Sequence, residues 1–434
     1  MASTDDSVGS GPSRRVSRHH SNDSILGISR SPRRGRVGRH PSYELQRSCD
    51  RDTHVTNMTG DTLGSFSDDK DDADFGLAPD LADRLVKRTE ARVSQVVASS
   101  KYVQANCTLP DVPRFSRDDF VLGDMIAFGG FSNVYAIENF TVETDLTDTD
   151  PEEKPKRYVI KHLNPKLAFN PKKLVVGAKD LVMEAHFLSA FDHKHIIKLR
   201  GWSAAGINGF SSAGRADGFF LILDRLSLTL SKRISRWREE EKVRKTMTKG
   251  RSHAKNQLLL TRLKVAIDIA SAVAYLHERR ILFRDLKPAN IGFDPNNVLK
   301  VFDFGLAVEI PYHEDPETTF KLAGNTGTSR YMAVEVIRKD PYNLKADVFS
   351  YSILLWEIMA LSKPYDGLLG PQVKESVSLF GERPSVPRSW PVAIRRLLRR
   401  GWSESISNRP TMISVLDTLE KVYEASSKSG GEFS

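Results

Sequence analysis

The sequence predicts an α+β protein with two lobes, the first rich in strands and the second rich in helices, preceded by a disordered tail. Alternating apolar residues typical of strands cluster before residue 226, at 119–128, 157–163 and 219–226. Apolar residues at helical spacing dominate after it, at 259–278 and 346–361. Residues 1–78 are rich in Ser, Arg, Asp and Gly, so they cannot bury enough apolar surface to fold.

Length and composition indicate a protein of the reducing cell interior. The chain has 434 residues, enough for one large two-lobed unit and a tail. Its two cysteines, Cys49 and Cys107, cannot build a disulfide framework. The first residues lack an apolar signal region, and the most apolar run, 351–361, is interrupted by Glu357 and too short to span a bilayer. We expect a cytoplasmic protein without a membrane segment, with a nuclear location left open.

The net charge of +9 is concentrated in one place. Residues 231–255 hold ten Lys or Arg and three Glu. Nucleic acid or an acidic peptide could bind such a patch, but we expect a solvated insert. Two further polar inserts, 141–156 and 203–218, are predicted to be surface loops.

The predicted order of segments follows from these patterns. Residues 79–110 should form a helix, starting at Pro79, and a linker. The folded domain should span 117–424, divided into lobes at residue 226, and 425–434 should be disordered.

A glycine-rich hairpin is the first candidate binding element. The stretch 126-IAFGGFSNVY-135 lies between two predicted strands, and small residues there let backbone amides approach phosphates. The candidate positions are Ala127, Gly129, Gly130, Ser132 and Val134. Such hairpins are common, so this signal alone is weak.

Two charged positions come next. Lys161 ends a predicted strand, and burying its ammonium would require a carboxylate, for which Glu184 on the following helix is the candidate. Two ordinary surface charges would be the simpler interpretation of this pair by itself.

The stretch 281-ILFRDLKPANIGFD-294 adds a joint constraint. Asp285 can orient a hydroxyl proton, Lys287 can neutralise a phosphoryl group, and Asn290 offers an oxygen to a hard cation. Asp303 follows eighteen residues after Asp285 and supplies a second oxygen. Asn290 and Asp303 together predict a Mg²⁺ site at the phosphates of a nucleotide.

At this point residues 117–424 resemble a eukaryotic protein kinase domain of the serine/threonine type. The glycine hairpin, VIK, Glu184, RDLKPAN, DFG, GTSRYMAVEV, DVFSYSILLWE and NRP occur in the family's order. FGGFSNVY and GTSRYMAVEV are similar to the tyrosine-kinase-like group. The resemblance implies a monomeric enzyme that transfers phosphate from ATP, with Mg²⁺, to Ser or Thr of protein substrates in signalling.

The resemblance also implies residue roles. Lys161, held by Glu184, would contact the α- and β-phosphates, Asp285 would be the catalytic base, and Lys287 would contact the γ-phosphate. The adenine would lie against Val159, Leu223, Asp224 and Leu226. The expected structural contacts are Glu335 with Arg409, Asp347 with the backbone at residues 283 and 284, and Phe283 with Phe304.

Phe283 stands where the family has histidine. A phenylalanine ring should keep the apolar contact with Phe304, so activity should be retained. Arg284 is expected to bind a phosphate on the activation loop, at Thr318 or Thr319, with Thr326 and Thr328 nearer the substrate platform. The alternative is a loop ordered without phosphate by its own acidic residues. If the loop is phosphorylated, an upstream kinase is a possible partner.

Two other functions remain as alternatives. A catalytically dead scaffold is suggested by Ala127, Ser132 and Phe283, which depart from the family pattern. A nucleic-acid-associated protein is suggested by the basic segment 231–255, and would show binding that depends strongly on salt.

Overall fold

The computed structural model describes residues 76–144, 146, 157–246 and 251–429. The two segments expected to be disordered lie largely outside these ranges. Their described ends differ from the expectation: Leu77 is buried and its amide donates to the carbonyl of Gly214, and helix α11 (Met412–Ser429) runs past residue 424. The ordered part therefore extends beyond both predicted boundaries.

The first lobe is built on a six-stranded sheet with the order β1-β5-β6-β4-β3-β2. All neighbouring strands are antiparallel except β1 and β5. The predicted alternation correctly located three of these strands. The strands are β1 (Arg114–Phe115), β2 (Phe120–Phe128), β3 (Ser132–Phe140), β4 (Tyr158–Leu163), β5 (Leu199–Ser203) and β6 (Phe220–Asp224).

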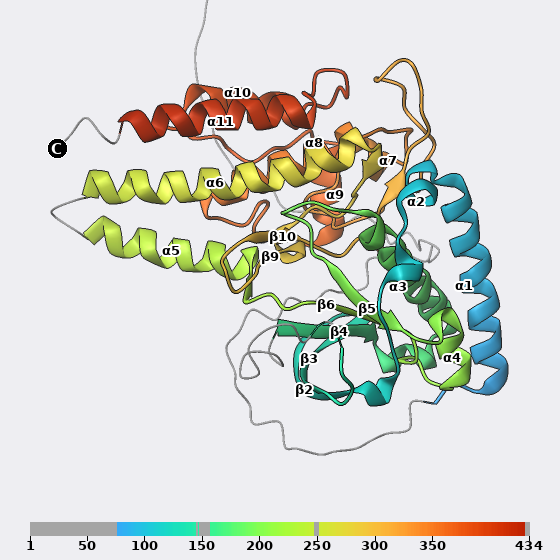
Figure 1. Cartoon of the computed structure of the whole chain (residues 1–434). Helices are drawn as coiled ribbons and strands as arrows, with labels where there is room; N and C mark the ends of the chain where they lie inside the picture. Colours follow the sequence, from blue (N-terminus) through green and yellow to red (C-terminus); the bar gives the residue numbers. More distant parts are fainter. Residues whose placement is uncertain (1–75, 145, 147–156, 247–250, 430–434) are drawn as a thin grey trace, which may run out of the picture. The chain divides into compact units, whose positions relative to one another are not determined.

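Helix α3 is the central helix of this lobe. Asn170 caps its first turn by accepting a hydrogen bond from Lys173 N, and Pro171 occupies the first helical position. Helix α1 packs along α3 and against α4 (Figure 1). The helices are α1 (Pro79–Ser99), α2 (Lys101–Asn106), α3 (Pro171–Ala190) and α4 (Gly209–Ser212), with 3₁₀ turns η1 (Leu109–Asp111), η2 (Arg117–Asp119), η5 (Pro165–Phe169) and η6 (Gly206–Asn208).

The second lobe is helical, which confirms the predicted two-lobed α+β fold. Helices α5, α6 and α11 run side by side (Figure 1). The helices are α5 (Leu230–Thr246), α6 (Arg251–Glu278), α7 (Val334–Arg338), α8 (Lys345–Ala360), α9 (Gly370–Ser378) and α10 (Val392–Gly401), followed by α11. Short elements line the junction of the lobes: β7 (Leu228–Thr229), β8 (Ile281–Leu282), η7 (Pro288–Asn290), β9 (Ile291–Phe293), β10 (Leu299–Val301) and β11 (Val308–Glu309).

Helix α8 is the core of the second lobe, and every residue from Lys345 to Met359 is buried. A helix that is apolar on all sides must be enclosed by other elements. Its first turn nevertheless carries Asp347, which accepts hydrogen bonds from the backbone N–H groups of Phe283 (2.8 Å) and Arg284 (2.9 Å). The chain before Asp285 is thereby fixed to the most buried helix.

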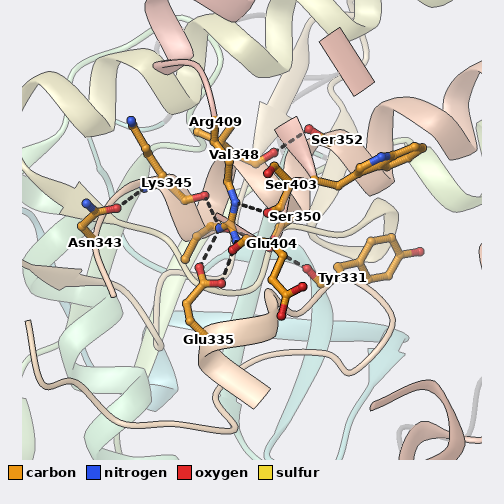
Figure 2. Close-up of polar contacts among 12 residues, drawn as sticks. Tyr331, Glu335, Asn343, Lys345, Val348, Ser350, Ser352, Ser403, Glu404 and Arg409 are labelled. Atoms are coloured by element: carbon orange, nitrogen blue, oxygen red, sulfur yellow. Dashed lines mark hydrogen bonds and ion pairs between the residues drawn. The ribbon is translucent and has the colours of Figure 1, made fainter. Parts of the chain in front are cut away.

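A buried ion pair closes the base of this lobe. Arg409 donates two parallel hydrogen bonds to Glu335, at 2.6 and 2.7 Å, and further bonds to the carbonyls of Lys345 and Ser403 (Figure 2). Only 1% of Arg409 is exposed. A guanidinium can be buried this completely only because its donors meet acceptors in the planar geometry that suits it.

The insert 203–218 is not the polar surface loop that its composition predicted. It contains η6 and α4, and Phe210 and Ala216 are fully buried. The backbone doubles back so closely that a Cβ on Gly209 would lie 2.1 Å from the carbonyl oxygen of Gly218. Helix α1 covers the insert and supplies the apolar partner that could not be anticipated from the insert alone.

The basic insert 231–255 also differs from the expected loop. Residues 231–246 belong to α5, and 251–255 begin α6. Ile234 and Trp237 are buried, because they fall on the side of α5 that packs against the domain. The insert 141–156 lies mostly outside the described residues. No helix in the described ranges is both long enough and apolar enough to cross a membrane.

We predict that Arg409→Ala lowers the free energy of unfolding by about 3–5 kcal/mol, because Glu335 would remain buried without its partner. Urea denaturation of the full chain measures the change. The control is Lys421→Ala, which removes an exposed ion pair with Asp417 and should have little effect. Equal effects of the two substitutions would contradict the prediction.

Candidate active site

Lys161 lies at the meeting point of the two lobes. It belongs to β4, where it pairs with Val134 of β3 on one side and Leu221 of β6 on the other. Its Nζ is 2.5 Å from Glu184 Oε2 and 2.9 Å from Asp303 Oδ1. Burial disfavours the ammonium, but Asp303 and Glu184 outweigh that effect and raise the pKa of Lys161 above its usual value. The lysine is therefore held in its charged form.

Asp303 brings the segment after β10 to this lysine. Its backbone φ is +71°, a conformation that non-glycine residues seldom adopt and that clusters at functional sites. Desolvation would raise its pKa, but Lys161 and, to a smaller extent, Lys287 lower it below the usual value. The side chain is 44% exposed, so a carboxylate oxygen remains open to the cleft.

The predicted groups of the 281–294 stretch gather around Asp285. Lys287 Nζ donates to Asp285 Oδ2 at 2.7 Å, and Thr328 Oγ1 donates to Asp285 Oδ1 at 2.7 Å. Asn290 Nδ2 donates to both the carbonyl (2.9 Å) and Oδ2 (3.0 Å) of Asp285. The carboxylate of Asp285 is thus aimed by three side chains from two separate segments.

Gly327 permits the contact between Thr328 and Asp285. Its φ is +104°, and a Cβ there would lie 2.3 Å from the carbonyl oxygen of Arg284. Any larger residue would push the segment carrying Thr328 away from the loop carrying Asp285.

The donor set fits a hard divalent cation. Because Asn290 turns its amide nitrogen toward Asp285, its Oδ1 points away from that carboxylate. Asp303 contributes carboxylate oxygen, and both are the ligand types that Mg²⁺ prefers. The backbone N–H of Phe302, next to Asp303, donates to the carbonyl of Asn290 at 3.0 Å, so the clusters around Lys161 and Asp285 lie on adjoining segments.

The aromatic contact expected for Phe283 is present. Its ring centroid is 5.0 Å from that of Phe304, and Phe304 in turn is 5.2 Å from Phe191 at the end of α3. Phe283 and Phe304 are fully buried. The packing of this position therefore needs a ring and makes no use of an imidazole.

Most residues predicted to contact the nucleotide lie on strands β2, β3, β4 and β6 of the sheet or in the turn between β2 and β3. Ala127 of β2 is opposite Val134 of β3, and the hairpin is closed by the amide of Gly129 donating to the carbonyl of Ser132 (2.8 Å), with Gly130 exposed between them. Val159 is opposite Leu223 in the ladder. These contacts place the hairpin directly beside the strand that carries Lys161.

The end of β6 and the chain that follows it bring two further predicted contacts to the same edge. Asp224, the last residue of β6, binds Arg200 with its carboxylate at 2.8 Å and lies opposite Tyr158 in the ladder. The side chain of Leu226 lies against Gly292 of β9.

The expected regulatory residues are not all brought together. Arg284 Nε donates to the carbonyl of Leu306 (2.6 Å), whereas Thr318 Oγ1 is 2.7 Å from His313 Nδ1, and Thr319 is exposed. Glu317 forms an ion pair with Lys345 of α8. Thr326 is buried and donates to the carbonyl of Ala323. An acidic residue therefore anchors this loop in the described structure.

Two buried polar residues near the site were missed from the sequence. Tyr331 donates to Glu357 Oε2 at 2.6 Å, and burial raises the pKa of Glu357 to about 7. In the sequence Glu357 was noted only as an interruption of an apolar run. A carboxyl group in a fully buried helix requires a partner, and that requirement was the available signal.

Comparison with known proteins gives a consistent family. A model of the family described as protein tyrosine and serine/threonine kinase matches residues 121–419. Serine/threonine-protein kinase STY46 of Arabidopsis thaliana is 38% identical over 174 residues, which is 40% of this chain and 29% of the relative. Serine/threonine/tyrosine-protein kinase HT1 of the same plant is 38% identical over 165 residues, 38% of this chain and 40% of the relative.

A third relative comes from another organism. Dual specificity protein kinase shkB of Dictyostelium discoideum is 40% identical over 153 residues, 35% of this chain and 23% of the relative. The aligned segments thus cover well under two thirds of each of these relatives. The family match, in contrast, covers more than half of this chain and contains every residue of the two charged clusters, so the chain belongs to the protein tyrosine and serine/threonine kinase family.

Proposed function

We propose that this protein is an ATP-dependent kinase that transfers the γ-phosphate to serine and threonine hydroxyls of other proteins. One observation carries the proposal: Lys161 is bound at once by Glu184 and Asp303, which come from different lobes. Apolar residues of similar size would pack better at these positions, so packing does not explain why the residues are charged. An ammonium held by two carboxylates, one of which keeps an oxygen open to the cleft, is the arrangement that phosphoryl transfer requires.

The residues divide the chemistry among themselves. Lys161 would bind the α- and β-phosphates, and the amides of the hairpin at Gly129 and Gly130 would cover them. Asp285 would orient the substrate hydroxyl and accept its proton, while Lys287 would neutralise the transferring group. Asn290 and Asp303 would hold Mg²⁺, which when bound neutralises charge on the phosphates.

The preference for serine and threonine rests on Lys287 and Thr328. Lys287 bridges Asp285 and Thr328, with its Nζ 3.0 Å from Thr328 Oγ1, so the lysine and the threonine that are typical of serine/threonine kinases lie together at Asp285. The printed name of STY46 specifies serine/threonine, whereas those of HT1 and shkB include tyrosine or dual specificity. Transfer to tyrosine is therefore one outcome that the assay below must distinguish.

The two alternatives are less well supported. A scaffold without catalysis would not need the carboxylate of Asp285 to be aimed by Lys287, Asn290 and Thr328. Nucleic-acid binding by the basic segment is weakened because three glutamates of α5 lie among its basic residues, and Glu239 and Glu240 pair with two of them. We propose protein substrates as the partners and a monomeric enzyme in the cytoplasm.

We predict that Asp285→Asn lowers phosphate transfer by about 10²–10⁴-fold, because the amide cannot accept the hydroxyl proton. The full chain and the variant are incubated with Mg-ATP and a basic protein, and the modified residues are mapped by mass spectrometry. Incorporation into Ser and Thr by the parent alone is expected. The control is Asp417→Asn, an exposed carboxylate on α11. Equal incorporation by parent and Asp285→Asn, with nucleotide binding intact, would favour the scaffold.

We predict that Phe283→His gives no large gain in activity, because the position contributes an apolar ring against Phe304. Phe283→Ala should destabilise the protein by about 3–5 kcal/mol, since it leaves a cavity beside Phe304. Initial rates and urea denaturation measure the two effects. An increase in rate of about tenfold or more on introducing histidine would mean that the missing imidazole limits catalysis.

We predict that phosphate on Thr318 or Thr319 raises activity by recruiting Arg284 from the carbonyl of Leu306, since a charge-assisted bond is stronger than a neutral one. The double substitution of both threonines by alanine should then abolish activation by an upstream kinase. The contact of Glu317 with Lys345 supports the alternative, in which the loop is already ordered. Full activity of the double variant, together with loss of activity in Glu317→Ala, would establish that alternative instead.

A further inference from the structure

The segment that precedes the sheet of the first lobe, from Leu77 to Asp111, packs along α3. Helix α1 lies along α3 in Figure 1, and α2 continues from it toward the second lobe. The side chains that face α3 and its surroundings belong to the main hydrophobic core: Leu77, Ala82, Leu85, Val86, Val93, Val103 and Leu109. This segment is thus part of the folded domain, although it precedes residue 121, where the family match begins.

The start of α2 binds the segment that follows Asp303. Ser100 Oγ donates to Glu309 Oε2 at 2.5 Å, and the backbone N–H of Tyr102 donates to the same oxygen at 2.9 Å. Ser100 is 2% exposed and also accepts a hydrogen bond from Val103 N, which fixes its rotamer. Glu309 is therefore held by two donors that lie more than 200 residues earlier in the chain.

Tyr102 attaches the same turn to the end of α3. Its hydroxyl donates to the carbonyl of Ala190 at 3.0 Å, and its ring stacks on Phe191 with centroids 6.0 Å apart. Burial raises the pKa of Tyr102 to about 12, so the phenol keeps the proton that it donates. Arg279, the first residue after α6, donates to the same hydroxyl at 3.2 Å. One tyrosine thus joins α3 to the second lobe.

The residues after α2 add a further attachment. Thr108 Oγ1 donates to the carbonyl of Ser189 at 2.7 Å, and Cys107 Sγ is 3.2 Å from Ser189 Oγ. Two of the last carbonyls of α3, those of Ser189 and Ala190, are therefore satisfied by this segment. The contacts of Tyr102 and Thr108 fix the end of α3.

These attachments act on both halves of the candidate active site. Helix α3 carries Glu184, the partner of Lys161. Glu309 lies in β11, paired with Ile281 of β8, and β8 leads directly into Phe283 and Asp285. A single turn of chain around Ser100 therefore touches the helix that positions Glu184 and the strand pair that precedes the catalytic loop.

We propose that Ser100, Tyr102 and Glu309 form a positioning lock that holds α3 and the segment after Asp303 in the arrangement in which Lys161 reaches Glu184. The three are positioning residues, since none contacts the reacting groups. This inference rests on the proposed kinase activity for its rate measurements. A purely stabilising role would lower the free energy of unfolding in the variants and leave the rates of the folded protein unchanged.

The test uses the full chain with Cys49→Ser, so that Cys107 is the only thiol. The variants are Ser100→Ala, Glu309→Gln and the double variant, each confirmed to be folded at the assay temperature. The matched controls are Ser99→Ala, an exposed neighbour of the lock, and Glu420→Gln, an exposed carboxylate on α11. Ser100→Thr keeps the hydroxyl that Ser100→Ala removes, so its kcat/KM and its rate of Cys107 alkylation should equal those of the parent.

We expect each lock variant to lower kcat/KM for ATP by about tenfold, the effect of losing one hydrogen bond to a charged group. The double variant should be no slower than either single one, because Ser100 acts through Glu309. Alkylation of Cys107 by N-ethylmaleimide should accelerate to a similar degree, since the turn opens more often. Both controls and Ser100→Thr should behave like the parent.

Two results would overturn the proposal. Rates and Cys107 alkylation equal to the parent in both single variants would show that the turn positions nothing. Multiplying effects in the double variant would show that Ser100 and Glu309 act separately. If the parent itself transfers no phosphate, the proposed function fails, and the alkylation rates alone then decide whether the lock holds α2 and α3 in place.

Discussion

The structure depends on the need to pair one buried ammonium. Lys161 lies in the middle of a sheet, where an unpaired charge would be strongly unfavourable, and its two carboxylate partners come from α3 and from the segment after β10. Neither partner is near it in sequence. The lobes must therefore approach each other in one relative arrangement before the charge of Lys161 is satisfied, and this condition makes the cleft between them specific.

The second lobe meets a corresponding requirement with its own buried charges. Asp347 binds the backbone before Asp285, and Arg409 is satisfied by Glu335 and by backbone carbonyls. Such groups add little net stability compared with apolar residues of equal size, but they tolerate few alternative geometries. A loop that must present Asp285, Lys287 and Asn290 within hydrogen-bond distance of one another gains precision from being attached to them.

The sequence predicted the two lobes, the strands that carry the site and the residues of both charged clusters, because periodicity and motif spacing are local or jointly constrained features. It failed where partners are distant and unpatterned. The composition of the insert 203–218 is polar, and the helix that buries Phe210 lies more than a hundred residues earlier. Ser100 and Glu309 carry no motif at all, and only the folded chain brings them together. The roles of the individual site residues remain predictions.

Because the preceding segment packs along α3, the region that matches the family and the region that folds as one unit begin at different residues. The region recognised by family comparison begins at residue 121, but the hydrophobic core begins at Leu77. A fragment that began at the family boundary would expose to solvent the apolar side chains of α3 that the preceding segment covers. An exposed apolar patch of this kind promotes aggregation. A gene rearrangement that moved the catalytic region without the preceding helices would transfer the catalytic residues. It would leave behind part of the hydrophobic core that the catalytic region needs in order to fold.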